Sequence, residues 1–201
     1  IFEILYITIM KAFYTLLILL IPYVGFGQSS SVQNNYKLGN YTTFKKNNIV
    51  FQVKKPLPSF IQTKESYSAD GNDNLVVSYV TSEQADPIVL QIYATPIPVR
   101  FQNLNWDELF YTDESSKKFL DGFLGTNTQM KILKYKLVNI DGKDFLVSTS
   151  TLTHLGVTQK QINWITIHNK NFINIVSSTL LSSFNDNLLF IEKFGSSILI
   201  D

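Results

Sequence analysis

Residues 130–180 contain four stretches in which apolar and polar positions alternate, as they do in strands that bury one face. The stretches read MKILKYKLVNI, KDFLVSTSTLTH, VTQKQINWITIH and NFINIVSSTL. Asp141-Gly142 joins the first two and is a strong hairpin signal, because both central positions of a type I′ turn need positive φ. Residues 155–156 (Leu-Gly) and 169–170 (Asn-Lys) mark the other turns. The pattern therefore predicts a four-stranded antiparallel meander.

Three more strands are expected nearer the N-terminus. Ile49, Phe51 and Val53 alternate with polar neighbours in NNIVFQVKKPLPSF, and the prolines of that segment should end the strand. NLVVSYVTS at 74–82 and PIVLQIYATPIP at 87–98 are the other two, and a short loop separates them.

The period of the apolar positions becomes helical in residues 104–125 and again after residue 183. Asn105 is expected to cap the first helix, whose surface should carry the i,i+4 pairs Asp113–Lys117 and Glu114–Lys118. The second helix is expected to end at Gly195, and its apolar stripe comprises Phe184, Leu188, Ile191 and Ile198. This order of elements predicts an α+β fold with a central antiparallel sheet covered by helices.

The N-terminal segment IFEILYITIMKAFYTLLILLIPYVGFGQSS is hydrophobic and divides into recognisable parts. After Met10, Lys11 precedes an apolar run of about 13 residues, which is shorter than the roughly 20 that a helix needs to cross a bilayer. The small residues of GFG then precede a cleavage point between Gly27 and Gln28. We interpret residues 10–27 as a secretory signal peptide, so the protein is predicted to be exported, either periplasmic or secreted.

This interpretation divides the chain. Residues 1–9 are read as upstream translation or the edge of a fragment, 28–46 as a flexible leader, and 47–201 as one folded domain. The alternative is an uncleaved membrane anchor from Ile4 to Phe26. That anchor would place Lys11 within the membrane, at a cost of about 2.5–3.5 kcal/mol.

Composition excludes several kinds of chemistry. The chain has no cysteine, so disulfides, thiol catalysis and Cys-bound zinc are excluded. Its formal net charge is +1, Arg100 is the only arginine and the lysines are scattered, so no nucleic-acid partner is predicted. His154 and His168 fall at strand ends, and no third metal-binding residue stands at a spacing typical of a metal site. No metal or cofactor is therefore predicted. Nucleophile and phosphate-binding motifs are missing from the sequence, and no catalytic residue is predicted.

A few side chains remain as candidates for function. The acidic pairs 107–108 and 113–114 are adjacent on a helix and suit its N-terminal dipole better than general acid–base catalysis. Trp106 and Tyr111 are the predicted binding surface, because exposed aromatic side chains are frequent anchors at interfaces. A core position is the alternative for Trp106. The other aromatics open to a binding role are Trp164 and Tyr93.

Several local signatures resemble the PsbP-like superfamily, including its bacterial exported, DcrB-like members. They are a strand running into a proline pair (IVFQVKKPLPSF), the strand VLQIYATP before the long helix, the hairpin NIDGKDFLVSTSTLTH, and a final helix with FIEKFGSSI. The resemblance covers residues 47–200. It implies an α/β/α sandwich and binding or assembly roles that are mostly not enzymatic, and it supplies no functional residue to carry over.

These observations predict an exported, non-enzymatic binding or assembly module of the cell envelope. Its partner would be an envelope protein or a small ligand. One alternative is a membrane-tethered envelope protein that keeps its N-terminal helix, and membrane contact is expected only in that case. Another is an envelope hydrolase whose convergent site uses His154 or His168.

Overall fold

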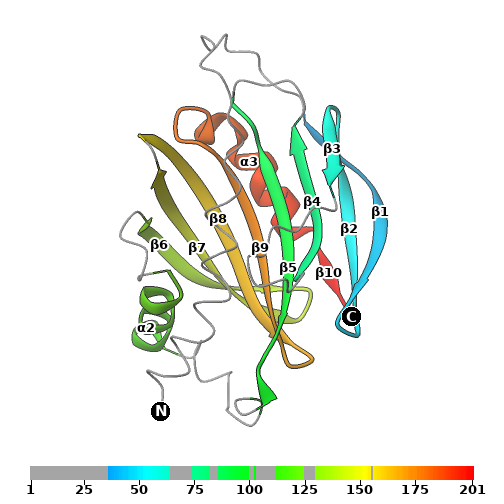
Figure 1. Ribbon diagram of the computed structural model, residues 1–201, viewed down its shortest axis with the longest axis vertical. Coiled ribbons are helices and arrows are strands. Elements are labelled where there is room, and N and C mark those ends of the chain that lie inside the picture. Colours follow the sequence, from blue (N-terminus) through cyan, green and yellow to red (C-terminus); the bar gives the residue numbers. More distant parts are fainter. Residues whose placement is uncertain are drawn as a thin grey trace.

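The computed structural model describes residues 36–63, 74–81, 86–99, 102, 112–124, 130–154 and 156–201. Figure 1 shows the strands and helices of these ranges. The strands are β1 (Lys37–Lys46), β2 (Ile49–Leu57), β3 (Phe60–Thr63), β4 (Leu75–Thr81), β5 (Val89–Pro96), β6 (Met130–Ile140), β7 (Lys143–His154), β8 (Val157–His168), β9 (Asn171–Leu180) and β10 (Leu199–Ile200). The helices are α2 (Asp113–Leu124) and α3 (Phe184–Ser196). No helix in the described ranges combines the length and the apolar character needed to cross a membrane.

Seven strands form an antiparallel sheet in the order β3-β4-β5-β9-β8-β7-β6. Its β6–β9 part is the predicted meander. Asp141 and Gly142 have φ of 50° and 75°, as a type I′ turn requires. Asn169 and Lys170 also have positive φ, at 45° and 58°. The local turn residues therefore fix the register of these hairpins.

A smaller sheet, in the order β1-β2-β10, joins the two ends of the described chain. The Val50 amide donates to the Asp201 carbonyl oxygen at 3.0 Å, and the Asp201 amide donates back at 2.9 Å. Residues 37–46, expected to belong to a flexible leader, form strand β1 along β2. Leu38 and Phe44 are only partly buried against the core, so β1 lacks the clear apolar alternation of the other strands. Its strand structure comes from pairing with β2.

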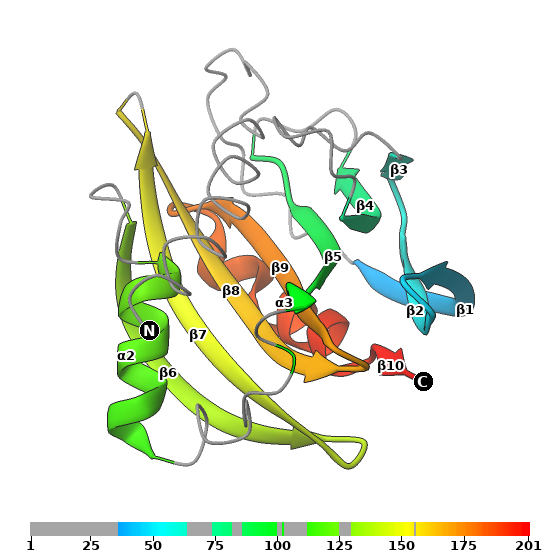
Figure 2. The same ribbon diagram turned by 60° about the horizontal axis from the view of Figure 1, so that its bottom comes forward.

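The two helices cover opposite faces of the larger sheet. On β7, Phe145 and Val147 belong to the core that includes α3, whereas Leu146 lies in a cluster with Phe119 and Leu120 of α2. Successive strand residues point to opposite faces, so these contacts define an α3 face and an α2 face. Figure 2 shows α2 in front of β6 and α3 behind β8 and β9. The predicted α+β fold, a central antiparallel sheet covered by helices, is confirmed.

The helices differ in detail from the expectation. Residues 103–111, including the predicted cap Asn105, lie outside the described residues. Gly195 was expected to end the second helix, and α3 ends one residue later, at Ser196. A Cβ atom built at Gly195 would come 2.4 Å from the Trp164 ring. Gly195 is therefore a packing position, at which the indole of β8 touches the helix backbone.

Candidate functional site

The predicted binding surface cannot be placed. Trp106, Tyr111 and the predicted cleavage residues Gly27 and Gln28 all lie outside the described residues. Trp164, the other tryptophan open to a binding role, is 4% exposed and packs in the core on the α3 face. Tyr93, the remaining aromatic open to a binding role, is 3% exposed and packs with Leu75 and Val176.

The two histidines lie too far apart to share a metal ion. His154 pairs with Val157 at the start of β8, and His168 is the last residue of that 12-residue strand. At about 3.3 Å per residue the separation is roughly 35 Å. Within the described ranges no three His, Asp or Glu side chains gather at a possible metal site.

His168 is half-buried rather than solvated, and its Nε2 atom is buried without a hydrogen-bond partner. Burial lowers its pKa, Lys143 lowers it further, and Asp201 acts in the opposite direction. Burial and Lys143 therefore both favour the neutral form of this side chain at the end of the strand.

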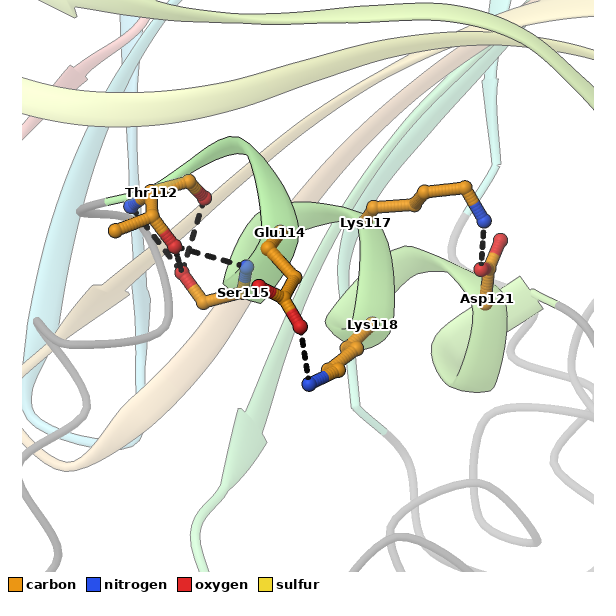
Figure 3. A network of polar contacts seen from close by, with 6 residues as sticks. All are labelled: Thr112, Glu114, Ser115, Lys117, Lys118 and Asp121. Atoms are coloured by element: carbon orange, nitrogen blue, oxygen red, sulfur yellow. Dashed lines mark hydrogen bonds and ion pairs between the residues drawn. The ribbon is translucent and has the colours of Figure 1, made fainter.

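The ion pairs of α2 lie within the helix itself. Glu114 pairs with Lys118 at 2.6 Å, as predicted, but Lys117 pairs with Asp121 rather than with Asp113 (Figure 3). The pKa of the exposed Glu114 is lowered by Lys118, which donates a hydrogen bond to it. These ion pairs lie on the surface, where such contacts stabilise a helix only slightly.

The N-terminus of α2 is capped locally by Thr112. The Ser115 amide donates to Thr112 Oγ1 at 3.0 Å, and the Thr112 amide donates to Ser115 Oγ at 3.2 Å (Figure 3). This reciprocal arrangement is a capping box with serine in place of the usual Glu or Gln. It accounts for a helical segment beginning at Asp113.

A group of buried polar side chains crosses the α2 face of the larger sheet. Register places Ser148 opposite Asn163, and Asn163 opposite Val176. Ile165, next to Asn163 on the same face, belongs to the cluster under α2. We call this group the polar patch, and none of its members is more than 4% exposed: Ser78, Gln91, Tyr93, Ser148, Ser150, Gln161, Asn163 and Asn174.

Several polar atoms of this patch have no partner in the described chain. They are Ser148 Oγ, Ser150 Oγ, both amide atoms of Asn163, and Asn174 Oδ1. The contacts that do occur are long: Gln91 Nε2 donates to Ser78 Oγ at 3.4 Å, and Gln161 Nε2 to Met130 Sδ at 3.9 Å. Leaving a buried polar group unsatisfied costs about 1–3 kcal/mol, and native proteins contain few such groups. Five such atoms on adjacent strands therefore point to a site for polar groups from outside the sheet.

The patch carries no charge. Every residue on this face of β5, β9, β8 and β7 is uncharged within 89–95, 172–180, 159–167 and 146–152. Tyr93 is the titratable member, and burial raises its pKa further above the neutral range. Hydroxyl and amide groups can both donate and accept, so the patch can match neutral hydrogen-bonding groups without a counter-ion.

The sequence contained part of this signal. In VTQKQINWITIH, Gln161 and Asn163 alternate with Ile162 and Trp164, and this alternation assigns the two polar residues to one face. It does not show that this face is buried, because burial depends on elements far away in the chain.

The fold matches solved structures of low sequence identity. The solution structure of cyanobacterial PsbP (CyanoP) from Synechocystis sp. PCC 6803 has a TM-score of 0.57 and 13% identity, over 87% of this chain and 98% of that one. LpqN of Mycobacterium tuberculosis has a TM-score of 0.51 and 12% identity, over 83% of this chain and 92% of that one. No protein-family profile and no curated protein sequence matches the chain. The protein therefore has the PsbP-like fold, as the sequence resemblance predicted.

Proposed function

We propose that the protein is an exported, non-catalytic binding module of the cell envelope, and that its polar patch binds a ligand through uncharged hydroxyl or amide groups. The five buried polar atoms without partners on the α2 face carry this proposal. A ligand that satisfies them removes a penalty that the free protein bears, so binding gains specificity as well as affinity.

The chemistry of the patch supports binding rather than catalysis. General acid–base and nucleophilic catalysis need a group that exchanges a proton near the working pH. Tyr93 is the titratable side chain of the patch, and its pKa is raised by burial. The remaining members are serines, asparagines and glutamines, which hold and orient a ligand but do not transfer protons at neutral pH.

Two observations support a role at the envelope. The segment 10–27 has the three parts of a secretory signal peptide. LpqN, which shares the fold, is described as involved in cell envelope biogenesis in its own organism. Fractionation of cells that express the full chain should find the protein outside the cytoplasm, with a mature N-terminus at Gln28. Cytoplasmic retention would contradict the export part of the proposal.

Binding can be tested by nuclear magnetic resonance with the full chain and defined probes. The uncharged probes are maltose, diacetylchitobiose and N-acetylglycinamide, and citrate and spermine are the charged controls. At least one uncharged probe should shift the amide signals of Ser148, Asn163 and Asn174, and neither charged probe should do so. If no uncharged probe shifts these signals, the proposed ligand chemistry is wrong.

Matched serine variants link any binding to the patch. Ser148→Ala removes an unpartnered buried hydroxyl from the α2 face, whereas Ser177→Ala removes one from the α3 face of β9. Both residues are 0% exposed. Binding should weaken in Ser148→Ala and persist in Ser177→Ala, and equal affinities for the two variants would overturn the assignment of the site.

A further inference from the structure

Strand β6 is a long edge of the larger sheet. β7 pairs with one side of it, and no strand in the described ranges pairs with the other side. β6 has 11 residues, whereas β3 at the opposite edge has only 4. A long edge presents a row of backbone donors and acceptors that another extended chain can pair with.

The two faces of this edge differ in chemistry. Lys131, Lys134 and Lys136 lie opposite Thr151, Thr149 and Val147 of β7, and the core position of Val147 assigns all three lysines to the α3 face. A β-bulge between Ile132 and Lys134 keeps the lysines on that face. Ile132, Tyr135 and Leu137 consequently share the α2 face, opposite Ser150, Ser148 and Leu146.

The charge on this edge is not neutralised within the described chain. Lys131, Lys134 and Lys136 are exposed, and they form no ion pair with a described residue. Lys117 of the neighbouring helix is already matched by Asp121. The edge therefore offers three cationic side chains on one face to an acidic partner.

A cavity of about 580 Å³ lies between α2 and β6. Leu120, Ile132 and Tyr135 contribute apolar surface to it, and Tyr135 Oη donates to the Asp113 carbonyl oxygen at 3.2 Å, which ties the strand to the helix. Leu133 and Leu137 on the same strand are each 47% exposed. Apolar side chains of a partner strand can therefore be buried beside β6 on the α2 face.

We propose that β6 is a docking edge for an extended, acidic segment of a partner protein, which adds to the sheet as an eighth strand. Cross-strand neighbours share a face, so the segment should alternate acidic and apolar residues. Its acidic side chains would face Lys131, Lys134 and Lys136, and its apolar side chains would face Leu137 and the cavity under α2. This surface is separate from the polar patch, and the proposal does not depend on the proposed function.

Edge lysines and a bulge also protect a sheet against pairing with other chains, so the test must separate docking from protection. The probe is a ten-residue peptide of alternating Glu and Val, measured by calorimetry against the full chain. The controls are a Lys-Val peptide, a scrambled Glu-Val peptide, and the alternating Glu-Val peptide with alternate backbone nitrogens methylated. The unmethylated alternating Glu-Val peptide alone should bind, and salt should weaken its binding. Failure of this peptide to bind would mean that the lysines only protect the edge.

Charge-reversal variants test the surface. Lys134→Glu combined with Lys136→Glu should weaken Glu-Val binding roughly ten-fold or more and create affinity for the Lys-Val peptide. The control, Lys55→Glu with Lys45→Glu, changes net charge equally but lies in the smaller sheet, and it should retain the affinity for the Glu-Val peptide.

Hydrogen exchange supplies the geometric test. Bound Glu-Val peptide should slow amide exchange within Met130–Ile140 and leave Phe60–Thr63 unchanged, because only β6 gains a hydrogen-bonded neighbour. Binding that leaves β6 exchange unaltered, or that survives N-methylation, would overturn strand addition.

Discussion

The two faces of the seven-stranded sheet are built from the same strands but differ in how their buried polar atoms are arranged. The α3 face is predominantly apolar, with Trp164 packed on Gly195 and Tyr79 edge-on to Phe194 at 6.4 Å between ring centroids. The α2 face places Asn163 and Ser148 side by side, buried and without partners in the described chain. The α3 face also holds buried polar atoms without a partner, Tyr79 Oη and Ser177 Oγ among them, but these two lie on strands that are not neighbours, whereas the five of the polar patch lie on the neighbouring strands β7, β8 and β9.

A cluster of unpartnered polar atoms on the α2 face is what the proposed binding role of that face predicts. Burying apolar surface contributes about 25 cal/mol per Å², whereas each unsatisfied buried polar group costs about 1–3 kcal/mol. The contrast between the faces can be measured by substitutions that remove equivalent atoms from each.

The largest effect is expected for Phe194→Ala on the α3 face. Phe194 is 0% exposed and lies in the main core, so loss of its ring should lower the free energy of unfolding by about 3–5 kcal/mol. Chemical denaturation measures this loss. The control on the same helix is Leu189→Ala, because Leu189 is 65% exposed and should contribute less than about 0.5 kcal/mol. Similar losses in both variants would contradict the assignment of the α3 face as the stabilising one.

The next largest loss in the free energy of unfolding is expected for Gly195→Ala. In an exposed helix interior this change stabilises by roughly 1 kcal/mol, because alanine is the better helix former. Here the added Cβ would lie 2.4 Å from the Trp164 ring, so we expect overpacking to cost about 1–3 kcal/mol. The Trp164 fluorescence should shift at the same time. A stabilised variant with unchanged fluorescence would show that α3 does not contact the indole closely.

These positions show what local sequence patterns can and cannot predict. Asp141-Gly142 and the alternation in residues 130–180 act over short distances, so the meander was predictable. Gly195 resembled a helix end because glycine often terminates helices, yet its helical position is explained by an indole from another strand. β1 was missed for a similar reason, because its strand structure depends on pairing with β2 more than on an apolar pattern in its own sequence.

The polar patch shows the same limit at the candidate site. Alternation in β8 places Gln161 and Asn163 on one face of the strand, but a polar strand face is ordinarily solvated. Burial of these residues arises only in the tertiary structure, when elements far away in the chain assemble beside them. A single strand therefore predicts which side chains share a face, and only the tertiary structure shows which of them are left without partners.

A smaller change in the free energy of unfolding should distinguish hydroxyl groups that form a hydrogen bond from those that do not. Thr166 Oγ1 donates to the Asp144 carbonyl oxygen at 2.8 Å, so Thr166→Val should cost about 1 kcal/mol. Ser148 Oγ has no partner, so Ser148→Ala should leave the free energy of unfolding unchanged or raise it by up to about 1 kcal/mol. Urea denaturation of both variants checks the difference. A loss in Ser148→Ala as large as that in Thr166→Val would show that the Ser148 hydroxyl is satisfied in the free protein.

The smallest effect at neutral pH is expected for Tyr79→Phe, which removes a buried hydroxyl without a partner from the α3 face. Burial raises the pKa of Tyr79 from 10 to about 12. Between these values the unfolded chain releases the phenolic proton while the folded protein keeps it. The free energy of unfolding should therefore fall as the pH rises through this window. Below pH 10 both states hold the proton, and the contribution does not change with pH.

Stability curves of the wild-type protein and Tyr79→Phe between pH 8 and 12 should therefore run parallel up to about pH 10 and then separate, because above that pH only the wild-type loses stability through the Tyr79 proton. Tyr93→Phe is the matched variant on the α2 face, where burial also raises the pKa. Its curve should depart from that of the wild-type in the same direction, since both shifts arise from burial. Parallel curves for Tyr79→Phe and wild-type over the whole range would mean that the Tyr79 hydroxyl reaches solvent, and that the α3 face is less completely packed than its apolar composition indicates.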